Sequence, residues 1–242
     1  MISAVVPVFN EELCLEKNLR ALAAFLRDHV AGTGEEFEIV AVDDGSTDRS
    51  RAIATALAVE CKVKLLENGV NLGKGATVRR GMLEADGDPT FFTDADLSTP
   101  LDQLTLFREK LAAGADVVIG TRKHAQANIG VPQNALRTWF GLGFTKLVNT
   151  TLGLDFTDYT CGFKLFRREA ARAIFGRSVV NGWAFDAEIL FLAKRLALNV
   201  VEVPVRWEDR PDSKVRVVRD TVRSLGELLA IRARAMAGKY GS

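Results

Sequence analysis

Short apolar runs alternate with amphipathic stretches through the first half of the chain. Runs of consecutive apolar residues are typical of strands buried on both faces, and apolar positions three and four apart are typical of helices that cover a sheet. The alternation predicts an α/β fold with a mostly parallel central sheet and helices on both faces. The expected strands are residues 2–9, 37–42, 63–66, 90–93 and 117–119. Two helices are expected after caps at Asn10 and at Ser46 or Thr47, and two more are expected over residues 72–83 and 101–111. The inner side of the first helix is expected to carry Leu13, Leu19, Leu22, Ala23 and Leu26.

Composition indicates a single domain over residues 1–242. The chain is 48% hydrophobic, which is enough to bury a large core, and its net charge of +1 predicts no nucleic-acid partner. Three widely spaced cysteines match neither a disulfide framework nor a zinc site and favour a reducing cytoplasm. The sequence contains no run of 18 apolar residues, so it predicts no transmembrane helix. Met1 leads into the first expected strand and leaves no room for a signal peptide.

The fourth expected strand runs directly into Asp94 and Asp96, which precede Pro100. Because side chains alternate along a strand, we expect both carboxylates on the same side of the strand end. Two hard oxygen ligands suit Mg²⁺ or Mn²⁺ that is shared with a phosphate-bearing ligand. The alternative is an aspartate-rich turn that binds no metal.

Asp43 and Asp44 follow the second strand in a similar way. Residues 46–48 offer more capping side chains than one helix needs. The two aspartates therefore remain to accept hydrogen bonds from a base or a ribose at the carboxyl edge of the sheet.

The glycine-rich loop at residues 71–76 is not a P-loop. It lacks the four-residue spacer between glycines, and Gly75 stands where a serine or threonine would bind Mg²⁺. These two differences argue against a P-loop nucleoside triphosphatase. Lys74 either approaches a nucleotide or is a solvated lysine in a turn.

Eight short motifs are spread over the chain. They are residues 6–12, 43–48, 71–75, 94–100, 160–166, 182–188, 201–207 and 213–215. In order and spacing the first four resemble family 2 glycosyltransferases with the GT-A fold. The last four resemble the dolichyl-phosphate β-glucosyltransferase branch, and the related polyprenyl-phosphate mannosyltransferases share the first half better than the second.

The chain departs from this branch in three places. Tyr159 and Thr160 stand where an aspartate and a glutamine are usual, and Phe9 replaces a tyrosine. The N-terminal membrane anchor of the eukaryotic members is not in this sequence, so we expect a bacterial or archaeal peripheral enzyme.

The resemblance implies a role for each motif residue. Residues 1–122 would bind the nucleotide sugar, 123–212 the acceptor, and 213–242 would form a basic amphipathic helix. Asp96 would hold the metal on the donor diphosphate, with Asp94 nearer the ribose and sugar and Ser98 close to the metal. The donor site would be lined by Pro7, Phe9, Glu11, Asp43, Asp44, Lys74, Asp94, Ala95 and Asp96.

The acceptor side is implied in the same way. Arg122 and Arg137 match positions that bind the acceptor phosphate, and Arg forks suit phosphate oxygens. Lys214 matches a lysine that reaches the diphosphate. Asp186 follows Trp183, which is expected to be buried, and either positions the sugar or is a carboxylate at a helix N-terminus.

The expected reaction is inverting transfer of a hexose, most favourably glucose from UDP-glucose, to a polyprenyl phosphate. A phosphate acceptor needs no catalytic base, because its second pKa is about 6. The alternatives are a GDP-mannose-dependent mannosyltransferase, a transferase to a soluble sugar that would use Asp186 or Glu188 as base, and a non-catalytic sugar-nucleotide sensor. The sequence carries no signal for an oligomeric state.

Two stretches suit a membrane surface. Residues 139–144 are apolar, and residues 213–242 carry separate apolar and basic stripes, so we expect peripheral contact with the inner face of the cell membrane. A helix packed on the sheet with a solvated basic face is the alternative. The apolar stripe consists of Val218, Val222, Leu225 and Leu229. The basic stripe consists of Arg216, Arg219 and Arg223, followed by Arg232 and Arg234.

Overall fold

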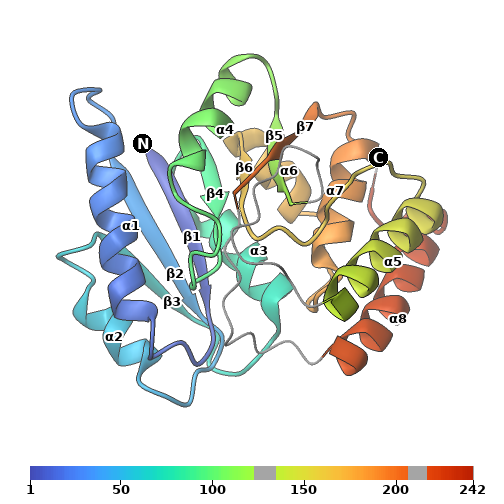
Figure 1. Cartoon of the computed structure of the whole chain (residues 1–242), viewed down its shortest axis with the longest axis horizontal. Coiled ribbons are helices and arrows are strands. Elements are labelled where there is room, and N and C mark those ends of the chain that lie inside the picture. Colours follow the sequence, from blue (N-terminus) through green and yellow to red (C-terminus); the bar gives the residue numbers. More distant parts are fainter. Residues whose placement is uncertain (123–134, 207–216, 242) are drawn as a thin grey trace.

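The computed structural model describes residues 1–122, 135–206 and 217–241, with side chains described in 1–122, 143–206 and 223–241. Within these residues seven strands form one sheet, and helices cover both of its faces (Figure 1). The strands are β1 (Ile2–Val8), β2 (Phe37–Asp43), β3 (Val63–Glu67), β4 (Thr90–Phe92), β5 (Val117–Thr121), β6 (Lys164–Phe166) and β7 (Val200–Pro204). The helices are α1 (Leu15–Val30), α2 (Ser50–Ala56), α3 (Lys74–Glu84), α4 (Gln103–Ala112), α5 (Ala135–Leu152), α6 (Arg168–Phe175), α7 (Phe185–Arg195) and α8 (Val217–Met236).

The sheet is mostly parallel, as the sequence predicts. Its strand order is β3-β2-β1-β4-β6-β5-β7, and β6 runs antiparallel to both of its neighbours. The chain moves outward from β1 through β2 to β3 and then returns to place β4 on the other side of β1. This reversal is a topological switch point, where parallel sheets bind ligands at the carboxyl ends of their strands.

Two hydrophobic layers hold the helices on the sheet. Along β1 the side chains alternate, so that Val5 joins the layer under α3, α6 and α7 while Ala4 and Val6 join the layer under α1, α2 and α4. Helices α5 and α8 lie side by side (Figure 1). Leu228 and Ile231 of α8 join the hydrophobic layer that contains Val5. Burial on both faces explains the continuous apolar runs of the central strands.

The first helix begins later than the sequence predicts. Asn10 has a φ of 56°, and its side-chain oxygen accepts the Thr47 N–H at 2.8 Å instead of capping a helix. The helix starts at Leu15, and Leu13 is 93% exposed rather than on the inner side. The prediction was wrong because the capping side chain of Asn10 is used between two loops.

Other boundaries shift for similar reasons. Neither Ser46 nor Thr47 caps α2, whose first residue Ser50 donates its N–H to the carboxylate of Asp48 at 2.9 Å. Helix α3 begins at Lys74, two residues later than predicted. The strands β6 and β7 lie beyond the last strand that the sequence pattern predicts.

Two helical glycines provide a matched test of the packing. A Cβ on Gly81 of α3 would lie 2.3 Å from a methyl carbon of the buried Val5, so we expect Gly81→Ala to lower the free energy of unfolding by roughly 1–3 kcal/mol. A Cβ on Gly226 of α8 would meet no described atom within 4 Å, so Gly226→Ala is expected to raise it by about 1 kcal/mol. Urea unfolding of both variants checks this, and equal effects would contradict the packing described.

Candidate active site

The loops after β1 and β2 are tied together at the carboxyl edge of the sheet. The hydroxyl of Ser46 accepts the Asn10 N–H at 3.0 Å, and the hydroxyl of Ser50 accepts the Glu11 N–H at 2.7 Å. Pro7 and Glu11 are half-buried there, and Phe9 is exposed. Hydrogen bonds between the loops thus fix the backbone on which the predicted nucleoside-binding residues stand.

The two aspartates after β2 have different surroundings although both are buried. Asp44 accepts the N–H groups of Leu72 and Gly73, each at 2.9 Å, and the side-chain amide of Asn68 at 2.8 Å. Asp43 accepts the Ser46 N–H at 3.1 Å, but its other oxygen is buried without a hydrogen-bond partner in the part of the chain that the structure describes. A buried unpaired acceptor is costly, so Asp43 is the better candidate to receive a ligand N–H or hydroxyl, and Asp44 holds the loop before α3.

A turn, rather than strand alternation, places Asp94 and Asp96. Strand β4 ends at Phe92, and Leu97 closes the turn with a φ of 51° and an N–H bond to the Asp94 carbonyl. One oxygen of Asp96 accepts the Ser98 N–H at 2.9 Å. The carbonyl of Ala95 accepts the side-chain amide of Asn18 at 2.8 Å, which holds the turn against α1.

Lys74 joins this turn from the start of α3. Its ammonium lies 2.6 Å from a carboxylate oxygen of Asp94. Burial works to lower the pKa of Lys74, but the charges of Asp94, Asp186 and Asp96 outweigh it, so the pKa is raised and the lysine stays protonated. Lys74 is therefore a fixed positive charge beside the two aspartates, as its place in the predicted donor site requires.

The residues at this turn fit a divalent metal shared with a ligand. Within residues 1–122, 143–206 and 223–241, no three histidine, cysteine, aspartate or glutamate side chains cluster as a metal site. Asp94 and Asp96 each retain acceptor sites beyond their protein contacts, and carboxylate oxygens are the donors that Mg²⁺ and Mn²⁺ prefer. Water and phosphate oxygens would complete such a coordination shell.

The second half of the chain meets this turn at Gly162. A Cβ on Gly162 would lie 1.9 Å from a carboxylate oxygen of Asp94, so any larger residue would displace that carboxylate. The adjacent Cys161 is fully buried, and its sulfur lies 3.9 Å from the hydroxyl of Thr99. Residues 160–166 and the Asp94 turn, predicted to serve acceptor and donor, are therefore in direct contact.

Arg122 lies at the carboxyl end of β5 and is held by Asp158. The guanidinium donates to both oxygens of the fully buried Asp158, at 2.8 and 3.0 Å, and to the hydroxyl of Thr160 at 2.7 Å. Burial works to lower the pKa of Arg122, but the charges of Asp158 and Asp94 raise it further above neutrality. This fork fixes a permanent cation beside the loop at residues 158–162.

A buried ion pair connects the same loop with α7. The ammonium of Lys164 lies 2.5 Å from a carboxylate oxygen of Asp186, and it also donates to the carbonyls of Tyr159 and Cys161 at 2.9 and 2.7 Å. Burial raises the pKa of Asp186, and the nearby charges of Lys164 and Lys74 oppose that effect. Asp186 is thus at the site, but it is a paired carboxylate in the first turn of a helix.

Glu188, two residues further along α7, serves the fold. It is fully buried and accepts the hydroxyl of Tyr240 at 2.6 Å and the N–H groups of Val179 and Val180 at 3.0 and 2.8 Å. These contacts leave Asp186 as the carboxylate of that motif that faces the site.

Two predicted residues cannot be placed. Arg137 belongs to α5, but its side chain lies outside the described residues, and Lys214 lies outside them altogether. Trp183 is 37% exposed rather than buried as predicted. The sequence reasoning also missed Asp158 and Lys164, although a lysine inside the apolar run at residues 163–166 is a signal that could have marked the second of them.

The protein family of this chain follows from its match to a family model. The model described as glycosyl transferase family 2 matches residues 3–175. This chain belongs to glycosyl transferase family 2. The resemblance to this family that the first four motifs show is therefore confirmed.

Individual relatives agree with this membership. The chain is 35% identical to a dolichyl-phosphate β-glucosyltransferase of Drosophila melanogaster, over 99% of this chain and 76% of that protein. It is 34% identical to dolichyl-phosphate β-glucosyltransferase ALG5C of Trichomonas vaginalis, over 88% of this chain, and the aligned region spans 65% of that protein's length. The GT-A fold is confirmed by a solved structure of glucosyl-3-phosphoglycerate synthase from Mycobacterium tuberculosis, with a TM-score of 0.70, 18% identity, and coverage of 96% of this chain and 80% of that one.

The buried Lys164–Asp186 pair gives a prediction about stability. Lys164→Met leaves a buried carboxylate unpaired and should lower the free energy of unfolding at pH 8 by about 3–5 kcal/mol. An unpaired Asp186 has a folded-state pKa above its unfolded value, so its penalty applies above that pKa and disappears as protonation proceeds at lower pH. The deficit relative to wild type should therefore shrink between pH 8 and pH 5 in urea unfolding.

The double variant Lys164→Met with Asp186→Leu is the control. It removes both charges together and should recover most of the lost stability. A deficit that is the same at both pH values, or that persists in the double variant, would show that the charge of Asp186 is not its cause.

Proposed function

We propose that this glycosyltransferase moves glucose from UDP-glucose to the phosphate of a polyprenyl phosphate and forms a β-linked lipid phosphosugar. The observation that carries the proposal is the contact at Gly162. It sets the Asp94 turn, with its carboxylates and Lys74, against the loop that holds Arg122. A donor diphosphate and an acceptor phosphate bound to these groups would meet at one edge of the sheet.

The similar proteins support both substrates. The relatives from Drosophila melanogaster and Trichomonas vaginalis carry the name dolichyl-phosphate β-glucosyltransferase, and so do relatives from Saccharomyces cerevisiae and Homo sapiens at 30% identity. The synthase from Mycobacterium tuberculosis was solved with Mn²⁺ and UDP-glucose. These names favour glucose over mannose and UDP over GDP for this chain.

The donor side would work through charge. Asp43 would accept a hydrogen bond from the nucleoside, and Lys74 would lie beside the diphosphate. Mg²⁺ or Mn²⁺ held by Asp94 and Asp96 would neutralise the departing diphosphate. Because the pKa of Lys74 is raised, its side chain would bring a positive charge to the diphosphate.

The acceptor side needs no general base. A phosphate monoester with a second pKa of about 6 is largely dianionic at neutral pH. One of its oxygens would form a bond to the anomeric carbon while the bond from that carbon to UDP breaks, and this single displacement converts an α-linked donor to a β-linked product. Arg122 would orient the phosphate, and Asp186, already paired with Lys164, would not remove a proton.

Helix α8 supports a peripheral membrane location. Its described apolar stripe is exposed: Leu225 is on the surface, Leu229 is 67% exposed and Met236 is 80% exposed. Leu228 and Ile231 are the α8 side chains that pack into the core, so the stripe is not the face that joins the core. Exposed apolar side chains beside Arg223 and Arg232 suit the cytoplasmic surface of an anionic membrane.

Among the residues that the structure describes, no helix is both long and apolar enough to cross a bilayer. We propose that the protein lies on the inner face of the cell membrane through the exposed stripe of α8. The other apolar stretch, residues 139–144, has most of its side chains outside the described residues. Binding to vesicles with and without anionic lipid, measured by sedimentation, tests this placement.

The metal proposal predicts a binding defect as well as a loss of turnover. Asp96→Ala should abolish transfer and remove the Mn²⁺-dependent part of UDP binding, because one of two carboxylate ligands is lost. Calorimetry with UDP in the presence and absence of Mn²⁺ measures this, and the unfolding midpoint without metal should match wild type. Full activity in excess chelator would contradict the proposed metal.

The acceptor proposal predicts a defect confined to one substrate. Arg122→Lys keeps a charge for Asp158 but loses the guanidinium fork, so KM for a short-chain polyprenyl phosphate should rise about tenfold. Arg137→Ala should act in the same direction. UDP-glucose affinity should be unchanged in both variants, because other loops bind the nucleotide.

Arg20→Ala is the matched control. Arg20 pairs with Glu16 on the exposed surface of α1, away from the site, and its loss should not alter transfer. The assay compares transfer to polyprenyl phosphate, 3-phosphoglycerate and a neutral sugar in detergent. If wild type prefers a neutral sugar, or if both arginine variants transfer normally, the lipid-phosphate proposal is wrong.

A further inference from the structure

Trp183 is an exposed aromatic side chain on a turn next to the site. It is 37% exposed, whereas Phe185, two residues later, is fully buried with its ring 6.0 Å from that of Phe92. Leaving a large indole in contact with water forgoes the stabilisation that its burial would give. An exposed tryptophan beside a reaction site is therefore a candidate for ligand contact.

The turn that carries Trp183 is anchored on both sides. The carbonyl of Asn181 accepts the N–H groups of Gly75 and Ala76 at 2.8 and 3.3 Å, which joins the turn to the start of α3. On the other side the Ala184 N–H donates to Glu227 of α8 at 3.1 Å. The indole therefore projects from a fixed backbone.

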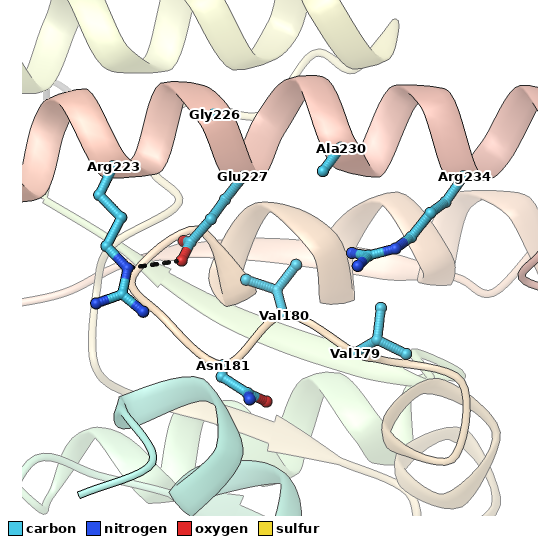
Figure 2. A pocket seen from close by; sticks show the side chains of 8 residues that line it. All are labelled: Val179, Val180, Asn181, Arg223, Gly226, Glu227, Ala230 and Arg234. Atoms are coloured by element: carbon cyan, nitrogen blue, oxygen red, sulfur yellow. Dashed lines mark ion pairs between the residues drawn. The ribbon is translucent and has the colours of Figure 1, made fainter.

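Figure 2 shows how Glu227 reaches the turn. It extends from α8 toward residues 179–181, across a cavity of about 330 Å³, and is paired with Arg223 at 3.4 Å. A Cβ on Gly182 would lie 2.1 Å from a Glu227 oxygen, so the backbone of the turn fits closely against this carboxylate. Close packing leaves the turn little freedom to move Trp183 into the core.

Lys74 connects the indole to the metal-binding turn. Its ammonium lies 5.3 Å from the centre of the indole ring and 2.6 Å from a carboxylate oxygen of Asp94. The cation–π contact shows that the ring lies beside the Asp94 turn, at the end of β4. Asp43, the candidate contact for the base, lies at the end of β2, and β1 separates these two strands.

This separation identifies the part of the donor that Trp183 would meet. A nucleotide sugar bound along the edge, with its base near Asp43 and its diphosphate near Asp94 and Lys74, would carry its sugar beyond the diphosphate. Glucose has equatorial ring hydroxyls, so its ring faces present C–H groups that can stack on an indole. An axial hydroxyl, as at C4 of galactose, interrupts one face of the ring and leaves the C–H groups of the other face open to stacking.

We propose that Trp183 forms the platform on which the transferred hexose stacks. The proposal rests on the donor assigned under the proposed function. Asp94 and Lys74 would hold the charged part of the donor, and Trp183 would contact the uncharged sugar. The base pocket would be independent of it.

Paired calorimetric titrations with UDP and UDP-glucose in Mn²⁺ test the proposal. Trp183→Ala should weaken UDP-glucose binding about tenfold while changing UDP binding by less than about twofold, and Trp183→Phe should retain most of the affinity. Phe9→Ala is the matched control, since this exposed aromatic residue stands in the predicted nucleoside pocket and should weaken both ligands alike.

Unchanged UDP binding also shows that the alanine variant is folded. Equal loss of UDP and UDP-glucose, or no loss of either, would overturn the proposal. If wild type binds GDP-mannose instead of UDP-glucose, the proposed donor is wrong. The same comparison with GDP and GDP-mannose would then test the role of Trp183 separately.

Discussion

The site depends on the balance of charge at one edge of the sheet. Asp94 is paired with Lys74, Asp158 with Arg122, and Asp186 with Lys164, while Asp96 bonds to a backbone N–H. Among these seven described side chains, four carboxylates and three cations leave one net negative charge. Because the donor diphosphate adds further negative charge, such a site is well matched to a divalent cation. The three ion pairs also explain how four aspartates can lie near one another in a partly buried place.

Each of these ion pairs also joins segments that are distant in the sequence. Lys74 connects α3 with the turn after β4, and Arg122 connects β5 with the loop before β6. Lys164 connects β6 with α7. The electrostatics therefore determine the geometry as well as the charge of the site. A substitution that removes one partner would disturb both.

The central part of the fold could be predicted because its signals are local. The strands β1 and β2 are mainly apolar runs that are buried on both faces, and such runs can be seen directly in the sequence. The strand β6 could not be predicted in this way. It has three residues, includes Lys164, and exists because β4 and β5 pair with it from both sides.

The residues of the site also fall into those that the sequence could predict and those that it could not. The position of Asp94 and Asp96 at the carboxyl edge of the sheet could be predicted because their motif directly follows a strand. The role of Lys164 depends on a partner 22 residues away, and Glu227 bonds to a backbone N–H 43 residues away. The exposure of Trp183 follows from anchors on α3 and α8. Contacts of this kind arise from packing, and one sequence carries no pattern that reports them.

The fit between Gly182 and Glu227 has a consequence for how α8 is attached. The carboxylate fills the space that any side chain at residue 182 would need, and it also accepts the Ala184 N–H. A side chain at residue 182 would therefore displace the Glu227 carboxylate and break its hydrogen bond to the Ala184 N–H. The residue at 182 thus decides whether α8 stays tied to the turn that carries Trp183.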